Sequence, residues 1–320
     1  MADIEAAAGR LRGIAVETPL IENAEVSKRA GARILLKPEN LQRTGSFKIR
    51  GAYNLLSRLD ESQAERGVVA WSSGNHAQGV ACAGKLLGIK TAIVMPEDAP
   101  RAKLENTKRL GGEVITYDRY TGDREAIARE IAGERGAELV PSYDHEDIIA
   151  GQGTVGLEIA EQAQALGIEP GRVLICCGGG GLTAGSAVAL KARVSDVSVH
   201  TVEPETFDDT ARSLVAGERL SVDPSARSIC DALQAHTPGR LTFPINRELT
   251  GPGLTVSEAE VRDAMRFAFE HLKLVVEPGG AVALAAALNR KVDMDGDVVV
   301  VISGGNVDAD LFAEIQAERN

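Results

Sequence analysis

Lys48 is the residue of this chain whose surroundings most clearly suggest chemistry, because it lies between Phe47 and Ile49. A lysine held by apolar groups loses hydration, which disfavours the ammonium form and lowers the pKa. Only the neutral amine attacks a carbonyl, so such a site suits a lysine that forms a Schiff base. Lys48 alone leaves a second interpretation open, a surface lysine on a helix beside Arg50.

A second segment combines small hydroxyls, a glycine and an amide between a predicted strand, 67–71, and a predicted helix, 77–87. Its residues are Ser72, Ser73, Gly74, Asn75 and His76. A turn from strand to helix presents backbone N–H groups and such side chains to an anion. A helix N-cap needs only one residue of this kind, so the series indicates an anion site.

Four consecutive glycines form the third segment. Gly178, Gly179, Gly180 and Gly181 follow a predicted strand, 172–177, and Leu182 opens a helix rich in Ala, Leu and Val. Glycines in series cost backbone entropy on folding, so they suggest a function. A strand, a glycine loop and a helix N-terminus together let bare main chain close on a phosphate.

These segments resemble one family. KPENLQRTGSFKIRGA around Lys48, SSGNHAQGVA, the tetraglycine loop and Ser303-Gly304-Gly305-Asn306 are similar to the pyridoxal-phosphate enzymes of fold type II, the tryptophan-synthase-β-like fold. The branch they resemble is the serine/threonine dehydratase and serine racemase group. The resemblance extends from about Thr18 to Asn306.

The resemblance implies roles for the residues of these motifs. Lys48 would hold pyridoxal 5'-phosphate as a Schiff base and, once displaced, remove the substrate's α-proton. Phe47, Asn75 and Ser303 would contact the cofactor ring, and residues Gly178 to Leu182 would bind its phosphate. Residues Ser72 to His76 would surround the substrate carboxylate, and Ser73 matches the base of the racemase branch on the face opposite the lysine.

Ser303 matches the residue that faces the pyridine nitrogen. A carboxylate there would hold the nitrogen protonated, whereas a hydroxyl can donate to the unprotonated nitrogen. The weaker electron sink favours elimination of a β-substituent over transamination. Ser303-Gly304-Gly305-Asn306 is also typical of a tight turn from a strand to a helix. The turn and the contact with the pyridine nitrogen are compatible.

A divalent metal site is expected at Glu203, Phe207 and Asp209, which match a metal site of the family. Two carboxylates and a backbone carbonyl are hard oxygen ligands suited to Mg²⁺, Mn²⁺ or Ca²⁺. An acidic surface loop is the alternative.

Composition limits the class of protein. The formal charge of −11 without Lys/Arg blocks argues against nucleic acid and anionic membranes as partners. Aromatic residues make up only 3%, so aliphatic side chains must build the core. The acidic N-terminus lacks the pattern of a signal peptide. We expect a cytoplasmic protein, four reduced cysteines and, from the family, a homodimer.

Alternating apolar runs and helical stretches predict an α/β fold with parallel sheets flanked by helices. A capping box at Ser257 predicts a helix that extends to about Leu272. The resemblance implies two domains, a small one at 62–144 and a large cofactor-binding one at 1–61 and 145–320. The site would lie in the cleft between them.

The predicted activity is β-elimination by an ammonia-lyase, with L-threonine or L-serine as first expectation. 3-Hydroxyaspartate would need one more cation, for which Arg119 and Arg124 are candidates, although both suit surface ion pairs. Serine racemase is a further alternative. A noncatalytic binding protein, or a dinucleotide enzyme using the G-x-G-x-x-G pattern at 151–156, is the alternative of another class. No clear strand precedes that pattern, which weakens it.

Overall fold

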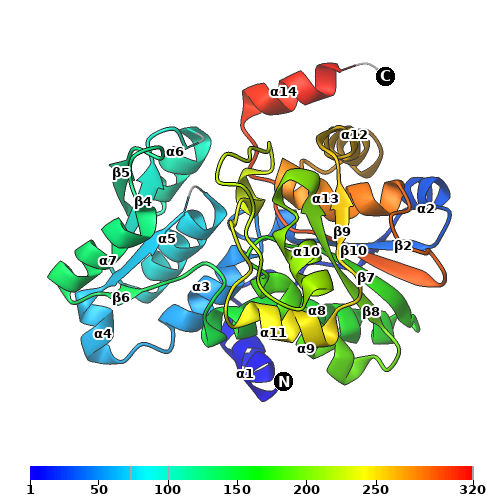
Figure 1. Cartoon of the computed structure of the whole chain (residues 1–320). Helices are drawn as coiled ribbons and strands as arrows, with labels where there is room; N and C mark the ends of the chain where they lie inside the picture. The colour runs from blue at the N-terminus through cyan, green and yellow to red at the C-terminus, as the bar shows by residue number, and fades with distance from the viewer. Residues whose placement is uncertain (73, 100, 319–320) are drawn as a thin grey trace.

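The protein is described by a computed structural model covering residues 1–72, 74–99 and 101–318. Two separate sheets organise the chain (Figure 1). Strands between Val68 and Leu139 form the smaller sheet, and strands from both ends of the chain form the larger one. The division into domains at 62 and 144 stays a prediction.

The larger sheet has the strand order β1-β2-β10-β7-β8-β9. All its neighbours are parallel except β1 and β2. The strands are β1 (Ile21–Glu22), β2 (Ile34–Pro38), β7 (Pro170–Cys176), β8 (Ser198–Pro204), β9 (Leu254–Val256) and β10 (Asp297–Ile302). Because parallel strands end at one edge, the loops after β2, β7 and β10 lie near each other.

The smaller sheet is wholly parallel, with the order β5-β4-β3-β6. Its strands are β3 (Val68–Trp71), β4 (Thr91–Pro96), β5 (Glu113–Tyr117) and β6 (Glu138–Leu139). It packs with helices α4 (Glu61–Arg66), α5 (Asn75–Leu87), α6 (Arg101–Arg109) and α7 (Arg124–Arg135).

Most of the remaining helices lie around the larger sheet, with α13 packed on β7 and β10 and α9 on β7 and β8, whereas α3 packs with α5 and α8. They are α1 (Ala2–Leu11), α2 (Ala24–Ala30), α3 (Lys48–Leu56), α8 (Glu146–Ala165), α9 (Gly181–Arg193), α10 (Asp209–Ala216), α11 (Thr242–Leu249), α12 (Glu258–Phe267), α13 (Pro278–Leu288) and α14 (Ala309–Ala317). Short 3-10 turns are η1 (Glu39–Leu41), η2 (Glu205–Phe207) and η3 (Asp231–Leu233), and η4 (Ala268–Leu272) is a π-helical turn.

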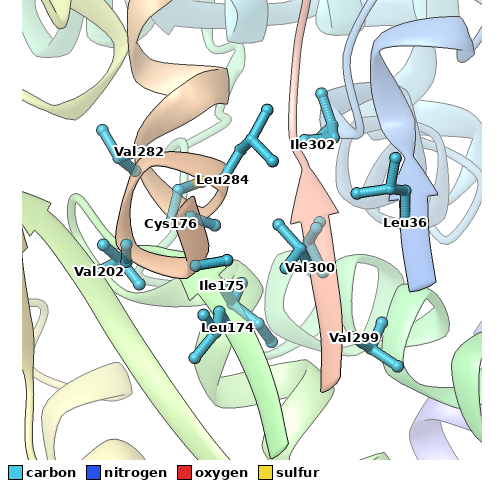
Figure 2. Close-up of a cluster of buried hydrophobic side chains, with 14 of the residues drawn as sticks. Leu36, Leu174, Ile175, Cys176, Val202, Val282, Leu284, Val299, Val300 and Ile302 are labelled. Atoms are coloured by element: carbon cyan, nitrogen blue, oxygen red, sulfur yellow. The ribbon is translucent and has the colours of Figure 1, made fainter. Parts of the chain in front are cut away.

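Aliphatic side chains build the main core, as the low aromatic content predicted. Val299 and Val300 of β10 pack with Leu174 and Ile175 of β7. Figure 2 shows this cluster with Val282 and Leu284 of α13. Helix α13 is buried along its whole length, which its run of alanine and leucine permits. All four cysteines are free and buried, as expected.

The apolar runs located the main strands, and the capping box at Ser257 is present, with Glu260 donating its backbone N–H to the Ser257 hydroxyl. The predicted helix continues to Leu272 as the π-helical turn. The G-x-G-x-x-G pattern at 151–156 lies inside α8, so it is not a turn between a strand and a helix. Its glycines allow close packing instead, because a Cβ at Gly153 or Gly156 would meet the backbone of α9.

None of the helices in the described ranges combines the length and the apolarity that a bilayer crossing requires.

Candidate active site

Lys48 is the first residue of α3, and the end of β10 lies beside it. The Phe47 N–H donates to the Ser303 carbonyl at 3.2 Å. Ser46 and Gly304 form an isolated antiparallel bridge. The structure thus brings together the Lys48 and Ser303 segments, which are about 250 residues apart in the sequence.

The Lys48 amine lies in a partly closed, mostly apolar environment. Its Nζ donates to the Ser142 carbonyl at 2.8 Å and lies 5.1 Å from the centroid of the Phe47 ring. Burial lowers the pKa of Lys48 to about 8, and Cys176 opposes this shift slightly. A substantial fraction of the amine is therefore neutral near physiological pH, as a lysine that attacks an aldehyde requires.

The Ser303 side chain is 5% exposed and interacts with the Cys176 thiol at the end of β7. Burial raises the pKa of Cys176 to about 11, although Ser303 and Lys48 both lower it. The thiol therefore stays protonated near neutral pH. Lys48, Ser303 and Cys176 are mutual neighbours at the carboxyl edge of the larger sheet.

The glycine loop turns its carbonyls toward α11. The Thr242 hydroxyl donates to the Gly179 carbonyl at 2.6 Å, and Asn246 Nδ2 donates to the Gly180 carbonyl at 3.3 Å. Helix α9 begins at Gly181, so its first N–H groups have no intrahelical acceptor. Gly180 has φ +91°, and a Cβ at Gly179 would collide with the Tyr143 ring. This cradle fits a phosphate group.

Four of the five residues predicted to bind substrate after β3 lie at described positions, and Ser73 lies outside the described residues. The Gly74 N–H donates to the Ser72 hydroxyl at 3.1 Å. The His76 ring is buried and its Nε2–H donates to the Val140 carbonyl at 2.8 Å. Burial, aided by Lys48, lowers the pKa of His76 to about 3. His76 is therefore neutral, and its side chain brings no positive charge to a carboxylate.

Asn75 opens α5 and its amide is held on both sides. Asn75 Nδ2 donates to Glu277 Oε1, and Asn306 Nδ2 donates to Asn75 Oδ1 at 2.8 Å. Glu277 is the N-cap residue of α13 and is 3% exposed. The Asn75, Ser303 and Glu277 segments therefore meet directly.

A buried ion network lies beneath Lys48. Arg50 is fully buried, with Nε 2.8 Å from Glu39 Oε2 and Nη1 2.5 Å from Glu158 Oε1. Lys37 Nζ donates to Glu158 Oε2 at 2.7 Å. The network joins α3 to β2, η1 and α8, and so it fixes the start of the helix that bears Lys48.

The predicted metal ligands lie after β8, away from Lys48. Both Glu203 and Asp209 are buried, and Phe207 lies between them in the sequence. The Glu203 carboxylate accepts from the N–H groups of Thr210 at 3.0 Å and Ala211 at 2.8 Å. Asp209 Oδ2 is buried and has no hydrogen-bond partner among the residues that the structure describes.

Burial raises the pKa of Asp209 to about 7, and burial together with Asp209 raises the pKa of Glu203 well above its ordinary value. Two buried carboxyl groups of this kind suit a bound cation. Within the described residues, however, no three Asp, Glu, His or Cys side chains gather as a metal cluster. Only a backbone carbonyl such as that of Phe207 could complete the protein's share of the ligands.

Sequence reasoning missed three contributors to the site. The Ser142 carbonyl accepts from Lys48, and a backbone acceptor leaves no trace in residue type. Tyr143 packs on the glycine loop. Lys103 reaches Asp231 and Glu277 from α6. Lys103 resembles the other charged residues of its helix in the sequence, so only its burial distinguishes it.

An amine with a lowered pKa, beside a glycine cradle for a phosphate, is the arrangement expected of an α/β enzyme that binds a phosphorylated aldehyde. A family model described as pyridoxal-phosphate dependent enzyme matches residues 11–304. The chain therefore belongs to this family, and it is a pyridoxal-phosphate-dependent lyase of fold type II.

Similar proteins span nearly the whole chain. An L-threo-3-hydroxyaspartate ammonia-lyase of Pseudomonas sp is 46% identical, covering 98% of this chain and 97% of that protein. A serine racemase of Schizosaccharomyces pombe is 40% identical, covering 99% and 97%. The crystal structure of a T.th. threonine deaminase superposes with a TM-score of 0.91 at 42% identity, covering 96% of this chain and 98% of that one.

Proposed function

We propose that this chain is an ammonia-lyase that converts a small β-hydroxy amino acid to a 2-oxo acid and ammonia by β-elimination. The observation that carries the proposal is the Lys48 amine. It donates to the carbonyl of Ser142, whose neighbour Tyr143 packs on the glycine loop, and its pKa of about 8 keeps part of it neutral. Pyridoxal phosphate, when bound, supplies the electron sink for the α-carbon. The protein supplies position, proton transfer and electrostatics.

Lys48 would accept the α-proton on Nζ, because its amine is partly neutral near physiological pH and is held within the site. The β-hydroxyl would leave with a proton as one water, and the resulting enamine would tautomerise to an imine, whose hydrolysis would consume one water and release ammonia. The net change for L-threonine is therefore 2-oxobutanoate plus ammonia. Ser303 would donate a hydrogen bond to the ring nitrogen, because its neutral hydroxyl cannot hold that nitrogen protonated as a carboxylate would.

Trapping with borohydride tests this proposal. The purified holoenzyme should be yellow, and reduction should attach the cofactor to the peptide that contains Lys48. The Lys48→Ala variant should yield no reduced adduct. A tag on another peptide, or no tag in the wild type, would refute the assignment.

Among β-hydroxy amino acids, we favour 3-hydroxyaspartate over the first expectation, L-threonine and L-serine. The two candidate cations differ in their surroundings. Arg119 is already paired with Asp98 at 2.8 Å and lies 3.9 Å from Asp231. Arg124, at the start of α7, has no ion pair within the described part of the chain, and its charge lowers the pKa of Tyr143, which burial raises.

Tyr143 packs on the glycine loop and directly follows Ser142, whose carbonyl holds Lys48. Arg124 is therefore the cation that can meet a second carboxylate near the site. The Pseudomonas sp relative, named for L-threo-3-hydroxyaspartate, supports the same preference. The product would be oxaloacetate with ammonia.

A substrate panel tests this choice. The enzyme should be assayed with L-threonine, L-serine, D-serine and the 3-hydroxyaspartate diastereomers for 2-oxo acid and for change of enantiomer. Arg124→Gln should lower kcat/KM for 3-hydroxyaspartate by about 10- to 100-fold, the loss of one hydrogen bond to a charge, and leave L-threonine within about threefold. Arg119→Gln is the matched control. Equal losses with both substrates would refute a contact to the second carboxylate.

Production of D-serine from L-serine at a rate comparable to elimination would instead support the racemase alternative. Ser73 is the residue that the family resemblance assigns to that reaction.

We also propose that Mg²⁺, or Mn²⁺ or Ca²⁺ in its place, binds Glu203, the Phe207 carbonyl and Asp209. The ion would neutralise two buried carboxylates and so stabilise the fold. Mg²⁺ should raise the thermal unfolding midpoint of the chelator-treated protein, and Asp209→Asn should abolish that rise. An equal response to Mg²⁺ in Asp209→Asn would refute this site.

We propose a homodimer as the state in solution, following the family. Leu41, Phe269 and Val275 are large apolar side chains that remain 51%, 45% and 46% exposed in one chain. Sedimentation equilibrium measures the mass, and a monomer at micromolar concentration would refute the proposal.

A further inference from the structure

Lys103 connects the segments around the smaller sheet with those around the larger sheet through a buried ammonium group. It belongs to α6, beside the smaller sheet, and only 4% of its surface is exposed. Its Nζ donates to Asp231 Oδ2 at 3.2 Å and to Glu277 Oε2 at 3.3 Å. Asp231 begins η3 and Glu277 precedes α13, so both acids come from segments around the larger sheet.

The Lys103 stem also lies against the segment that follows β3. A Cβ at Gly74 would collide with the Lys103 side chain. Burial disfavours the ammonium, but Glu277 and Asp231 outweigh it and raise the pKa of Lys103 above its ordinary value. Lys103 therefore stays charged at a pH where part of Lys48 is neutral.

The Glu277 carboxylate contacts both Lys103 and Asn75. One carboxylate oxygen accepts from Lys103, and the other accepts from Asn75 Nδ2. A carboxylate has no proton to donate, so it requires the NH₂ side of the Asn75 amide to face it. On the other side, Asn306 Nδ2 donates both to Asn75 Oδ1 and to the Thr44 carbonyl, each at 2.8 Å. These partners fix a single orientation of the Asn75 amide and leave one of its N–H groups for another acceptor.

We propose that Lys103 is a positioning residue, which holds the Glu277 side chain in place and thereby orients Asn75 toward the ring oxygen of the cofactor. This inference rests on the proposed function, because Asn75 is expected to contact the cofactor there. Without Lys103, Glu277 would be a buried charge with no other ion-pair partner among the described residues. It would then turn away from the site, and the Asn75 amide would lose the acceptor that fixes its orientation.

Arg119 provides the internal contrast. It lies 3.9 Å from Asp231 and has no contact with Glu277 in the described structure. Loss of Arg119 removes a cation from the same cluster but leaves the path from Lys103 to Asn75 intact. Lys108 is an exposed lysine on the same helix and serves as the matched control for a change of charge on α6.

The experiment measures the dissociation constant of pyridoxal phosphate for the apoenzyme and the absorption maximum of the bound cofactor. Trp71, the single tryptophan, ends β3 next to the site, so quenching of its fluorescence reports binding. Lys103→Gln should weaken binding by about tenfold or more, as expected for loss of an oriented hydrogen bond, and shift the absorption maximum. Lys103→Arg should remain within about threefold of wild type and restore the absorption maximum. Arg119→Gln and Lys108→Gln should match wild type.

Wild-type affinity and an unchanged spectrum in Lys103→Gln would overturn the inference, and so would an equal effect of Arg119→Gln. If Lys103→Gln does not fold, the Lys103→Met/Glu277→Gln double variant removes both charges and should show the same weakening. Wild-type binding by that variant would also overturn the inference. Failure of the proposed function has a different signature, because wild type itself would then carry no reducible cofactor on Lys48.

Discussion

Replacing Arg50 with methionine should destabilise the fold more than any replacement of an exposed arginine. Arg50 lies two residues after Lys48, is fully buried, and contacts Glu39 through two bonds of 2.8 Å. Glu158 accepts from both Arg50 and Lys37. Two cations and two carboxylates therefore balance in a region closed to solvent, apart from the 17% exposed side chain of Glu158.

The size of the stability loss follows from the buried carboxylate charge that remains unpaired. In Arg50→Met, Lys37 faces two carboxylates, so one buried negative charge has no partner. Loss of one partner of a buried ion pair costs about 3–5 kcal/mol. Arg50 holds the pKa of Glu39 below its ordinary value against the effect of burial, so burial should raise that pKa in the variant. The folded variant would then bind more protons than its unfolded chain, and its stability would fall further as pH rises above about 5.

Urea unfolding of the apoprotein, followed by circular dichroism, measures this loss. Arg58→Met is the matched control, because Arg58 pairs with Asp147 at 2.9 Å while its side chain is 48% exposed. We expect it to cost less than about 1 kcal/mol. The Glu39→Gln/Arg50→Met double variant should be at least about 2 kcal/mol more stable than the sum of the single changes predicts. An Arg50→Met cost no greater than that of Arg58→Met, or strict additivity with Glu39→Gln, would refute the reasoning.

Two further predictions concern Lys48 and the packing of α8 on α9. Because burial lowers the pKa of Lys48 from 10.5 to about 8, the unfolded apoprotein binds more protons between these values and stability should rise with pH across that window. The free energy of unfolding of Lys48→Met apoprotein should therefore exceed that of wild type by up to about 3 kcal/mol near pH 7. This difference should shrink as pH approaches 10.5. Urea unfolding measures it, and a difference independent of pH would contradict the explanation. Gly185→Ala should cost about 1–3 kcal/mol, because its Cβ would collide with the Ile149 carbonyl of α8. A Cβ at Gly133 would meet no described atom within 4 Å, so Gly133→Ala should leave the stability unchanged or stabilise α7. Equal shifts of the thermal unfolding midpoint for the two variants would contradict the packing explanation.

The long strands are predictable from the sequence because each is an apolar run between turn signals, as the predicted strand at 172–177 and the observed β7 (Pro170–Cys176) illustrate. The sequence did not predict β1, β6 and β9, which have only two or three residues and depend on pairing with a longer neighbour. The start of one helix is also hidden in the sequence. Helix α8 begins at Glu146, after the His145 side chain accepts from the Asp147 N–H. Polar residues and three glycines hide the helical period there, and packing against α9 outweighs the low helix propensity of glycine.

The candidate site was predictable where chemistry requires a particular residue type, as with Lys48, Ser303 and the glycine loop. It was not predictable where the contact uses a backbone atom, as with the Ser142 carbonyl. Nor could the sequence separate a buried lysine from exposed ones on the same amphipathic helix, as with Lys103 and Lys108. That distinction comes from the packing of α6 against the segments around the larger sheet, which a local sequence pattern does not predict.

The cations near the site differ in the acidic groups with which they are already paired, and this difference affects which substrate could bind. Lys103 faces Asp231 and Glu277, and Arg119 faces Asp98 and Asp231. Lys48 has lost part of its charge through burial. Under the proposed function, a monocarboxylate substrate would need only the N–H donors near Asn75, whereas a second carboxylate would need a cation that is not already paired with an acid. Arg124 meets that condition within the described residues. Selectivity for a dicarboxylate would therefore depend on one residue, and Arg124→Gln should convert the enzyme toward L-threonine without changing the chemistry at Lys48.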